Sequence, residues 1–462
     1  MGPSGPFPRS KSNFHEGRPR RRVTALVLFV RADGCYAPQT VQAYFDHVRA
    51  LERAYGAALE RAGFDAVLVH SGSLVRKTVF DDQDWPLRPT PHFQHWIPLA
   101  EPDAWVLARP GRRATLIRTT TTSFWETPPS PPAAFFFDAF DVVSVESWEA
   151  ARRHVPAGRV AFVGERDERG FGLPRDAALL GALDALRTKK TPWEVECLAE
   201  ANRVAARGHE AVRAAFAGGE TNELRLHLLY LEATQQDDPE TPYKNIVASG
   251  RNAATLHHVT YRKDASGAPS LLLDAGATRF GYCSDITRTH VRGASDAFAA
   301  LVAAVDAMQK RLCAAIRSGD KYESLHDESH RQTSAILRDL GVVRELSVEA
   351  IDARGISRAF YPHGLGHSLG LQTHDVGCAT MKPRPDNPFL RNTSVIEPGQ
   401  VFTIEPGVYF IESLLAPLRA GELAKHVDWA LVDALAPHGG VRIEDDVLVA
   451  EKVRNFTREV LP

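Results

Sequence analysis

The sequence has few cysteines and no long apolar run, and these two absences narrow the class of protein. Its five cysteines are scattered and form no CxxC pair: Cys35, Cys197, Cys283, Cys313 and Cys378. This pattern is neither a disulfide framework nor a zinc–thiolate site, and it is typical of a reducing compartment. No apolar run approaches the ~20 residues that a membrane helix needs. We therefore expect a cytoplasmic protein that does not interact with membranes.

An excess of charge of either sign is also missing. The chain carries 55 Lys and Arg against 57 Asp and Glu, a formal net charge of -2. No global electrostatic field favours a nucleic acid or a membrane surface, so neither is expected as a partner. The first half also lacks a phosphate-binding loop and a dinucleotide-binding fingerprint. The length of 462 residues suggests two or three domains.

The N-terminus is basic and then apolar, an order that imitates a signal peptide. Residues 1–22 hold four prolines and six Lys or Arg against one Glu, and an apolar run over residues 23–30 follows. The apolar run is short, Arg31 and Asp33 follow at once, and there is no small-x-small cleavage site. We therefore predict a disordered basic tail over residues 1–22 rather than a secretory leader.

The rest of the first half alternates between helical and strand patterns. Apolar residues recur at helical spacing over 39–62, and buried-strand runs occupy 66–70, 104–108, 114–117, 142–145 and 160–163. These predict an α/β domain with a mixed sheet over residues 23–187. A helix over 175–190 and Pro192 at a first helical turn place the boundary near 188. The second domain, residues 188–462, is expected to contain helices over 193–217, from a Thr221 cap through 234, 294–318 and 320–340.

The most informative stretch is residues 271–289, which contains two aspartates in a strand-like pattern. Three leucines lead into Asp274, and Asp285 precedes the β-favouring pair Ile286-Thr287. We predict two antiparallel strands joined through Gly276 and Gly281. Such a pair can place two carboxylates a few ångström apart, where like charges repel unless a cation lies between them.

Further candidate ligands occur downstream. His367 closes a glycine-rich turn that also presents His363, and Glu405 and Glu444 interrupt apolar strand-like runs over 401–410 and 440–449. Buried carboxylates are rare unless they are paired or bound to metal. Two divalent cations would cancel the four negative charges of Asp274, Asp285, Glu405 and Glu444. Carboxylates with one imidazole suit Mn²⁺ better than thiolate-preferring ions.

The ordered set Asp274, Asp285, His367, Glu405 and Glu444 resembles the five-ligand signature of the pita-bread metallopeptidases, which include methionine aminopeptidase, aminopeptidase P and prolidase. The resemblance extends over residues 188–462. The long insertion between Glu405 and Glu444, with residues 412–417 and Trp429, resembles bacterial prolidases (Xaa-Pro dipeptidases) and organophosphorus acid anhydrolases. The first half resembles theirs through 71–72, 81–82 and 92–93. The implied architecture is α/β (α+β), with a creatinase-like mixed-sheet domain before a pita-bread domain.

The resemblance also implies roles for individual residues. Two metals, most commonly Mn²⁺ with Co²⁺ or Zn²⁺ as alternatives, would hold a bridging hydroxide, and the metal ligand Glu405 would also be the general base. His374 would hold the oxyanion, and His363 and Arg442 would complete the catalytic group. Substrate binding is implied for four residues, of which the first two would hold the substrate carboxylate: His257, Arg391, Tyr243 and Leu390.

The function that follows is hydrolysis of Xaa-Pro dipeptides with release of the C-terminal proline. A homodimer is implied, in which the loop near Asp82 reaches the partner's site. Three alternatives stay open: an aminopeptidase P-like exopeptidase, an organophosphorus acid anhydrolase, and a pita-bread binding module, although such modules typically lose ligands that this chain keeps. The segment 375–388, expected to cover the site, is shorter than is usual in the family. Trp85 stands where relatives tend to have tyrosine.

Overall fold

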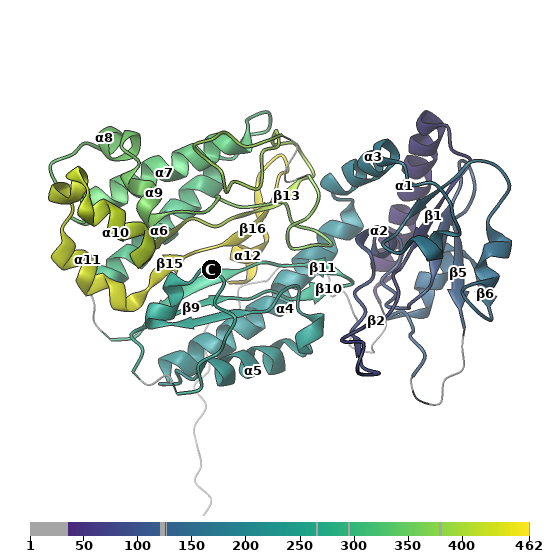
Figure 1. Cartoon of the computed structure of the whole chain (residues 1–462), viewed down its shortest axis with the longest axis horizontal. Coiled ribbons are helices and arrows are strands. Elements are labelled where there is room, and N and C mark those ends of the chain that lie inside the picture. The colour runs from purple at the N-terminus through teal and green to yellow at the C-terminus, as the bar shows by residue number, and fades with distance from the viewer. Residues whose placement is uncertain are drawn as a thin grey trace, which may run out of the picture.

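The computed structural model describes residues 36–120, 125, 127–264, 267–293, 296–377 and 381–461. The basic tail predicted over residues 1–22, Cys35 and Cys378 lie outside these residues. The described chain forms two lobes that lie side by side (Figure 1). Helices and strands alternate in both, so the expected mixed α/β class is confirmed.

The first lobe is built on a mixed five-stranded sheet. Its strand order is β6-β5-β4-β1-β7, in which β1 is parallel to β7 and antiparallel to β4. Every residue of β1, β4 and β7 is buried, as their continuous apolar runs predicted. The strands of this sheet are β1 (Ala66–His70), β4 (Trp105–Ala108), β5 (Thr115–Thr119), β6 (Asp141–Val145) and β7 (Val160–Val163). A separate hairpin consists of β2 (Val75–Arg76) and β3 (Asp84–Trp85).

Helix α1 (Pro38–Ala62) contributes one apolar face to the core of this lobe. Tyr44, Val48, Leu51 and Tyr55 follow helical spacing, and each is at most 3% exposed. The helix ends at Gly63, whose φ of 71° gives the left-handed cap that glycine adopts most easily. The predicted helix over 39–62 is thus confirmed. The lobe also contains α2 (Pro91–Gln94) and α3 (Ala177–Thr188).

Helix α4 (Pro192–Ala217) opens the second lobe. Thr191 Oγ1 accepts a hydrogen bond from the Glu194 amide, and the Glu194 carboxylate accepts one from the Thr191 amide. This reciprocal cap and the proline at the first position explain why a new helix starts here. The break between α3 and α4 was predicted, whereas the domain boundary near 188 stays a prediction.

Two antiparallel sheets meet in the middle of the second lobe. One has the order β12-β9-β8, the other β13-β16-β17, and β14 pairs with β15. A bridge between Thr287 and Glu444 joins the two halves. The strands are β8 (Ile246–Ser249), β9 (Ser270–Asp274), β10 (Thr278–Arg279), β11 (Tyr282–Cys283), β12 (Thr287–Val291), β13 (Val401–Ile404), β14 (Gly407–Tyr409), β15 (Gly440–Arg442), β16 (Asp445–Leu448) and β17 (Arg454–Asn455).

Helices cover these sheets from two sides (Figure 1). Apolar residues of α4 and α5 pack on β8 and β9, and those of α6 and α7 pack on β13 to β16. The carboxylate-bearing strand ends therefore lie between two layers of helices. The remaining helices are α5 (Glu223–Thr234), α6 (Asp296–Ala315), α7 (Tyr322–Asp339), α8 (Val348–Ala353), α9 (Ile356–Phe360), α10 (Glu412–Ala420), α11 (Trp429–Leu435) and α12 (Phe456–Val460). None of the helices in the described ranges is long and apolar enough to cross a membrane.

Three local predictions were wrong. Asn222, not Thr221, caps α5, because its side chain accepts the hydrogen bond from the Arg225 amide. The runs 401–410 and 440–449 are each two strands rather than one. The first run breaks at Glu405 and Pro406, since proline has no N–H to continue the ladder.

Candidate metal centre and active site

Two aspartates come from neighbouring antiparallel strands, as predicted. Asp274 ends β9 and pairs with Thr287 of β12, and Asp285 lies two residues before that partner. The turn between the strands is not simple, because it folds into the small β10–β11 hairpin. A Cβ at Gly276 would lie 2.1 Å from the Ser284 carbonyl oxygen, so only glycine allows the strands to approach this closely. Both carboxylates are buried, at 7% and 5% exposure.

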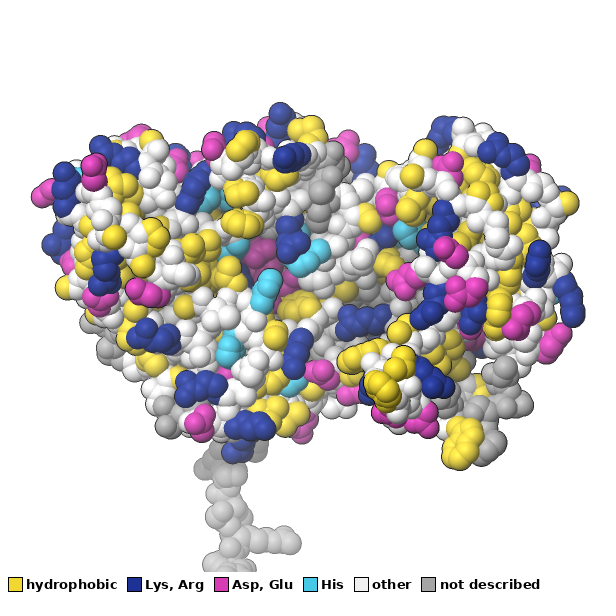
Figure 2. Space-filling view, in the orientation of Figure 1, with side chains coloured by type: hydrophobic (Ala, Val, Ile, Leu, Met, Phe, Trp, Pro, Cys, Tyr) yellow, Lys and Arg dark blue, Asp and Glu magenta, His cyan; other side chains and the backbone are white. Residues whose placement is uncertain are grey.

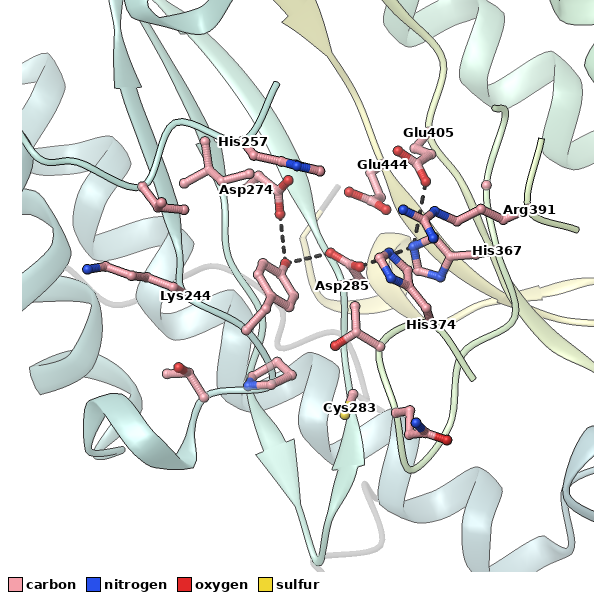
Figure 3. A pocket seen from close by; sticks show the side chains of 18 of the residues that line it. Lys244, His257, Asp274, Cys283, Asp285, His367, His374, Arg391, Glu405 and Glu444 are labelled. Atoms are coloured by element: carbon pink, nitrogen blue, oxygen red, sulfur yellow. Dashed lines mark hydrogen bonds and ion pairs between the residues drawn. The ribbon is translucent and has the colours of Figure 1, made fainter. Parts of the chain in front are cut away.

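The other three predicted ligands face these aspartates from the opposite side. His367 Nε2 lies 3.3 Å from Asp285 Oδ2 and 3.6 Å from Glu405 Oε1. Glu444 Oε2 accepts a 2.7 Å hydrogen bond from the hydroxyl of Thr287. Asp285, His367 and Glu444 offer ligand atoms that all lie within 4.8 Å of one another. Figure 3 shows the carboxylates pointing toward one another in one pocket, which all five side chains line.

The electrostatics of this group fit a bound cation. Burial, followed by repulsion from the neighbouring carboxylates, raises the pKa of Glu444 well above its ordinary value. Burial raises the pKa of Glu405 to about 7, although the charges of His367 and Arg442 act to lower it. Burial acts to lower the pKa of His367, but the hydrogen bond to Asp285 and the charges of Glu405 and Asp285 raise it to about 9. The buried negative charges therefore hold protons that a divalent metal would replace. Oxygen donors with one imidazole also suit such an ion.

Tyr243 lines the pocket and contacts both aspartates. Its hydroxyl donates to the carboxylates, at 2.7 Å from Asp274 Oδ1 and 2.5 Å from Asp285 Oδ1. Burial, and then the charges of the two aspartates, raise its pKa well above the ordinary value. Tyr243 is thus a neutral donor that fixes the orientation of both carboxylates.

A second set of polar contacts runs from Asp274 to His363. Arg442 Nη2 donates to Asp274 Oδ2 at 2.5 Å, and Arg442 Nη1 donates to the Tyr409 hydroxyl at 2.9 Å. The same hydroxyl lies 2.9 Å from His363 Nε2. Burial and then the charge of Arg442 lower the pKa of His363 to about 3, which keeps this imidazole neutral.

Sequence reasoning assigned no role to Tyr409 or Thr287. Tyr409 lies on β14, which pairs with β15 so that Gly407 faces Arg442. That register is a contact between segments far apart in the chain, and no local pattern indicates it. The Ile-Thr pair after Asp285 was noted only as a strand signal, although its threonine hydroxyl also contacts Arg442 Nε at 3.2 Å.

The pocket is a cavity of about 1460 Å³ that every predicted site residue lines. In Figure 2 the hollow has acidic side chains at its floor, with histidine and basic side chains around them. His257, His374 and Arg391 are exposed to it, whereas Leu390 is 4% exposed and packs into the core. In Figure 3, His257 and Arg391 lie on either side of the carboxylates.

The segment 375–388 was expected to cover the site, and this stays a prediction. Among its described residues only Pro388 lines the cavity. Arg384 is held on helix α7 instead, where its guanidinium lies 2.5 Å from Asp327 and 3.0 Å from Glu323. These ion pairs fix Arg384 to α7.

A second buried group of metal-ligating residue types joins the lobes: His47, His95 and Glu194. His47 and Glu194 are held by hydrogen bonds, and His95 Nε2 lies 3.4 Å from Glu194 Oε1. His47 Nδ1 lies 2.8 Å from Thr191 Oγ1 and its Nε2 lies 2.7 Å from the His95 carbonyl oxygen. Glu194 accepts from the Thr191 amide and from the Tyr282 hydroxyl. We interpret this group as a hydrogen-bonded joint between the lobes rather than a metal site.

Comparison with known proteins places this geometry in a family. The model of metallopeptidase family M24 matches residues 196–451, and that of the Xaa-Pro dipeptidase N-terminal domain matches residues 42–178. A Xaa-Pro dipeptidase of Stenotrophomonas maltophilia R551-3 is 40% identical over 90% of this chain and 97% of its own length. One from Xanthomonas campestris pv. campestris 8004 is 41% identical over the same shares.

The fold of this chain is also similar to that of solved structures. Aminopeptidase P from E. coli with the inhibitor Pro-Leu aligns with a TM-score of 0.71 at 21% identity, over 91% of this chain and 95% of its own. Proline aminopeptidase P II from Yersinia pestis aligns with a TM-score of 0.69 at 21% identity, over 91% and 97%. The two-lobed fold with buried carboxylates thus defines a metallopeptidase with a pita-bread catalytic region. The chain belongs to metallopeptidase family M24, and its relatives at about 40% identity are bacterial Xaa-Pro dipeptidases.

Proposed function

We propose that the protein is a dimetal Xaa-Pro dipeptidase that releases the C-terminal proline of its substrates. One observation supports this most strongly: five ligand residues line one cavity in a chain that is about 40% identical, over 90% of its length, to proteins of that name. We also propose residues 23–187 as the N-terminal domain, which contributes to dimerisation and covers the site, and 188–462 as the catalytic domain.

The proposed ligands are Asp274, Asp285, His367, Glu405 and Glu444. Two divalent cations, when bound, polarise the scissile carbonyl and lower the pKa of water. We propose Mn²⁺, with Co²⁺ and Zn²⁺ as alternatives, because the donor set is mostly carboxylate. Tyr243 and Arg442 hold the aspartates through the hydrogen bonds described above.

Glu405 is the proposed general base. It takes a proton from the attacking water and then gives it to the proline nitrogen, and its carboxylate lies 3.6 Å from His367 in the ligand group. His374 stabilises the negative charge that develops on the carbonyl oxygen. Its ring centroid lies 4.5 Å from that of His367, which places it at the edge of the ligand group. His363, held neutral beside Tyr409, is the proposed substrate-side histidine.

Arg391 and His257 form the proposed clamp for the substrate carboxylate. Both are exposed to the cavity and lie on either side of the ligand group (Figure 3). A guanidinium grips a carboxylate through two parallel hydrogen bonds, which a neutral amide cannot match. Leu390, adjacent to Arg391 and buried, contributes apolar wall to the cavity beside the clamp.

The length of the substrate tests the clamp. A tripeptide places an amide where the dipeptide has its carboxylate, so wild type should prefer Xaa-Pro over Xaa-Pro-Xaa by roughly ten- to a hundredfold in kcat/KM. Arg391→Ala should lose dipeptide activity and change tripeptide activity little. The measurement is kcat/KM for one dipeptide and its one-residue extension in both proteins, with metal content checked. An unchanged ratio in the variant would remove the clamp from the proposal.

An aminopeptidase P-like activity is the second candidate. The cavity of about 1460 Å³ exceeds the ~300–1,000 Å³ typical of small-molecule sites, which leaves room beyond a dipeptide. Equal cleavage of dipeptide and tripeptide by wild type favours this candidate. A phosphotriester assay tests anhydrolase activity in the same preparation. The binding-module alternative predicts no turnover of any of these substrates.

We further propose a cytoplasmic homodimer in which the loop near Asp82 reaches the partner's site. The β2–β3 hairpin that carries this loop exposes Val79 at 85%, Phe80 at 94% and Trp85 at 58%. Apolar side chains this exposed on one hairpin favour an interface. Sedimentation of wild type and Phe80→Asp tests the proposal, with a shift toward the monomer expected for the variant.

A further inference from the structure

Asp375, the residue after His374, lies in a buried cluster of charges with one cation from the first lobe and one from the link between the lobes. Its carboxylate is 3% exposed and accepts a hydrogen bond from Arg187 Nη2 through Oδ1. Lys190 Nζ donates to Oδ2 at 3.0 Å. Arg187 lies at the end of α3 and Lys190 in the link to α4, and they are 1% and 9% exposed. Two cations from outside the catalytic strands thus hold the segment that carries His374.

The same segment is fixed at several other points. Arg187 Nη2 also donates to Gln372 Oε1 at 2.9 Å, and the Asp375 amide donates to the Ser368 carbonyl at 3.0 Å. A Cβ at Gly370 would lie 2.0 Å from Asp375 Oδ2 and 2.7 Å from Lys190 Nζ, so the chain is packed directly against the cluster. The His374 side chain, by contrast, points into the open cavity (Figure 3).

We propose that Arg187, Lys190 and Asp375 are positioning residues for His374. They fix the backbone of the segment that carries His374. The imidazole can then meet the negative charge that develops on the carbonyl oxygen without a rearrangement of the segment. This inference rests on the function proposed above, which assigns that charge to His374. Buried ion clusters add little net stability because desolvation offsets the attraction, but they hold a defined geometry. A displacement of about 1 Å at a catalytic group lowers rates by on the order of a hundredfold.

The test compares Asp375→Asn with a matched control in wild-type and His374→Ala backgrounds. The control is Glu101→Gln, which removes a carboxylate of the first lobe that is 3% exposed, lies 2.6 Å from Arg118 and does not itself line the cavity. In otherwise wild-type protein, Asp375→Asn should lower kcat by ~10–100-fold, with KM and metal content nearly unchanged. Glu101→Gln should leave kcat unchanged even where it lowers the Tm.

The double variant separates positioning from a general loss of structure. If Asp375 acts through His374, Asp375→Asn should lower kcat by less than about threefold further in the His374→Ala background. Hydrogen exchange of a peptide over residues 368–377 gives a readout independent of turnover, and it should be faster in Asp375→Asn than in the control. Should Asp375→Asn fail to fold, Arg187→Lys is measured in the same way, because it keeps the charge and loses the guanidinium fork.

Three results would overturn the inference: an unchanged kcat in Asp375→Asn, the full loss repeated in the His374→Ala background, or unchanged exchange over residues 368–377. The proposed function fails differently. In that case wild type itself does not hydrolyse Xaa-Pro dipeptides, and the exchange measurement alone then decides whether the cluster holds the segment.

Discussion

At the scale of single residues, the site contains more buried negative charge than positive charge. Four carboxylates surround one histidine, and Arg442 pairs with only one of them, Asp274. Burial raises the pKa of Glu405 and of Glu444, and repulsion from the neighbouring carboxylates acts in the same direction. The same carboxylates on a protein surface would keep ordinary pKa values, since water would screen them.

Asp285→Asn tests the role of one ligand. The change removes a negative charge that lies 3.3 Å from His367 and accepts from Tyr243. Because a neutral amide is a much weaker ligand for a divalent ion, we expect the loss of at least one metal equivalent and nearly all activity, with the fold retained. Metal content after dialysis and kcat/KM are the measurements. Asp238→Asn, which changes the 3.0 Å pair of Asp238 with His227, is the control and should keep both. Full activity and metal content in Asp285→Asn would refute the ligand assignment.

At the scale of elements, short strands and glycine-rich turns determine where the ligands point. Glu405 follows β13 directly, and the Glu405 amide donates to the Leu365 carbonyl at 2.8 Å. The His367 amide donates to Thr403 Oγ1 at 3.1 Å. The turn that carries His363 and His367 is thus packed against β13. The positions of the two ligands His367 and Glu405 both depend on this packing.

Gly366→Ala tests this packing. Its Cβ would lie 2.2 Å from the Thr403 carbonyl oxygen and 2.4 Å from the Tyr322 hydroxyl. Since both are held in the core, the turn must shift, and we expect the free energy of unfolding to fall by about 1–3 kcal/mol or more, with weaker metal binding. Gly181→Ala is the control, because its Cβ meets nothing within 4 Å and it lies within helix α3. The measurement is urea unfolding of the metal-free proteins. Equal stability of the two variants would contradict the close packing.

At the scale of the whole molecule, the lobes are joined by buried polar groups rather than by an apolar contact alone. His47 from α1 and Glu194 from α4 meet there, with Nδ1 3.9 Å from Oε2. Lys190 and Arg187 extend this joint toward the segment of His374. The orientation of the first lobe is therefore tied to the active site through charged contacts.

These contacts predict sensitivity to acid. Burial lowers the pKa of His47 from 6.5 to about 4, so the folded state favours the neutral ring. The contribution of the neutral His47 ring to the free energy of unfolding is complete above pH 6.5. It is lost as the pH falls toward 4, because the unfolded state binds the proton at a higher pH than the folded state does. Burial acts to raise the pKa of Glu194, but His95 and His47 hold it well below its ordinary value, so its contribution is lost only below about pH 4.5.

We expect the metal-free protein to lose roughly 2–3 kcal/mol of unfolding free energy through His47 between pH 7 and 4.5. Other buried histidines add to the total, so the comparison is with His47→Gln, whose loss over the same range should be smaller by that amount. Urea unfolding at the two pH values measures both. Parallel losses in the two proteins would show that His47 does not titrate on unfolding.

The sequence by itself determined the features that depend on neighbouring residues. Helical spacing located α1 and α4, and continuous apolar runs located the strands of the first sheet. The order of Asp274, Asp285, His367, Glu405 and Glu444 indicated the family that the comparisons confirmed. These features follow from local periodicity and from the chemistry of single side chains, and both can be read along the chain.

The tertiary structure alone decided the contacts between distant segments. Tyr409 reaches Arg442 and His363 only because β14 pairs with β15, and Asp375 meets Arg187 across 188 positions of sequence. Arg384 in the segment 375–388 pairs with residues on a helix about sixty residues earlier. The energy of such contacts depends on burial and on the exact approach of two surfaces. Neither quantity exists until the chain has folded, so no pattern of neighbouring residues could have indicated them.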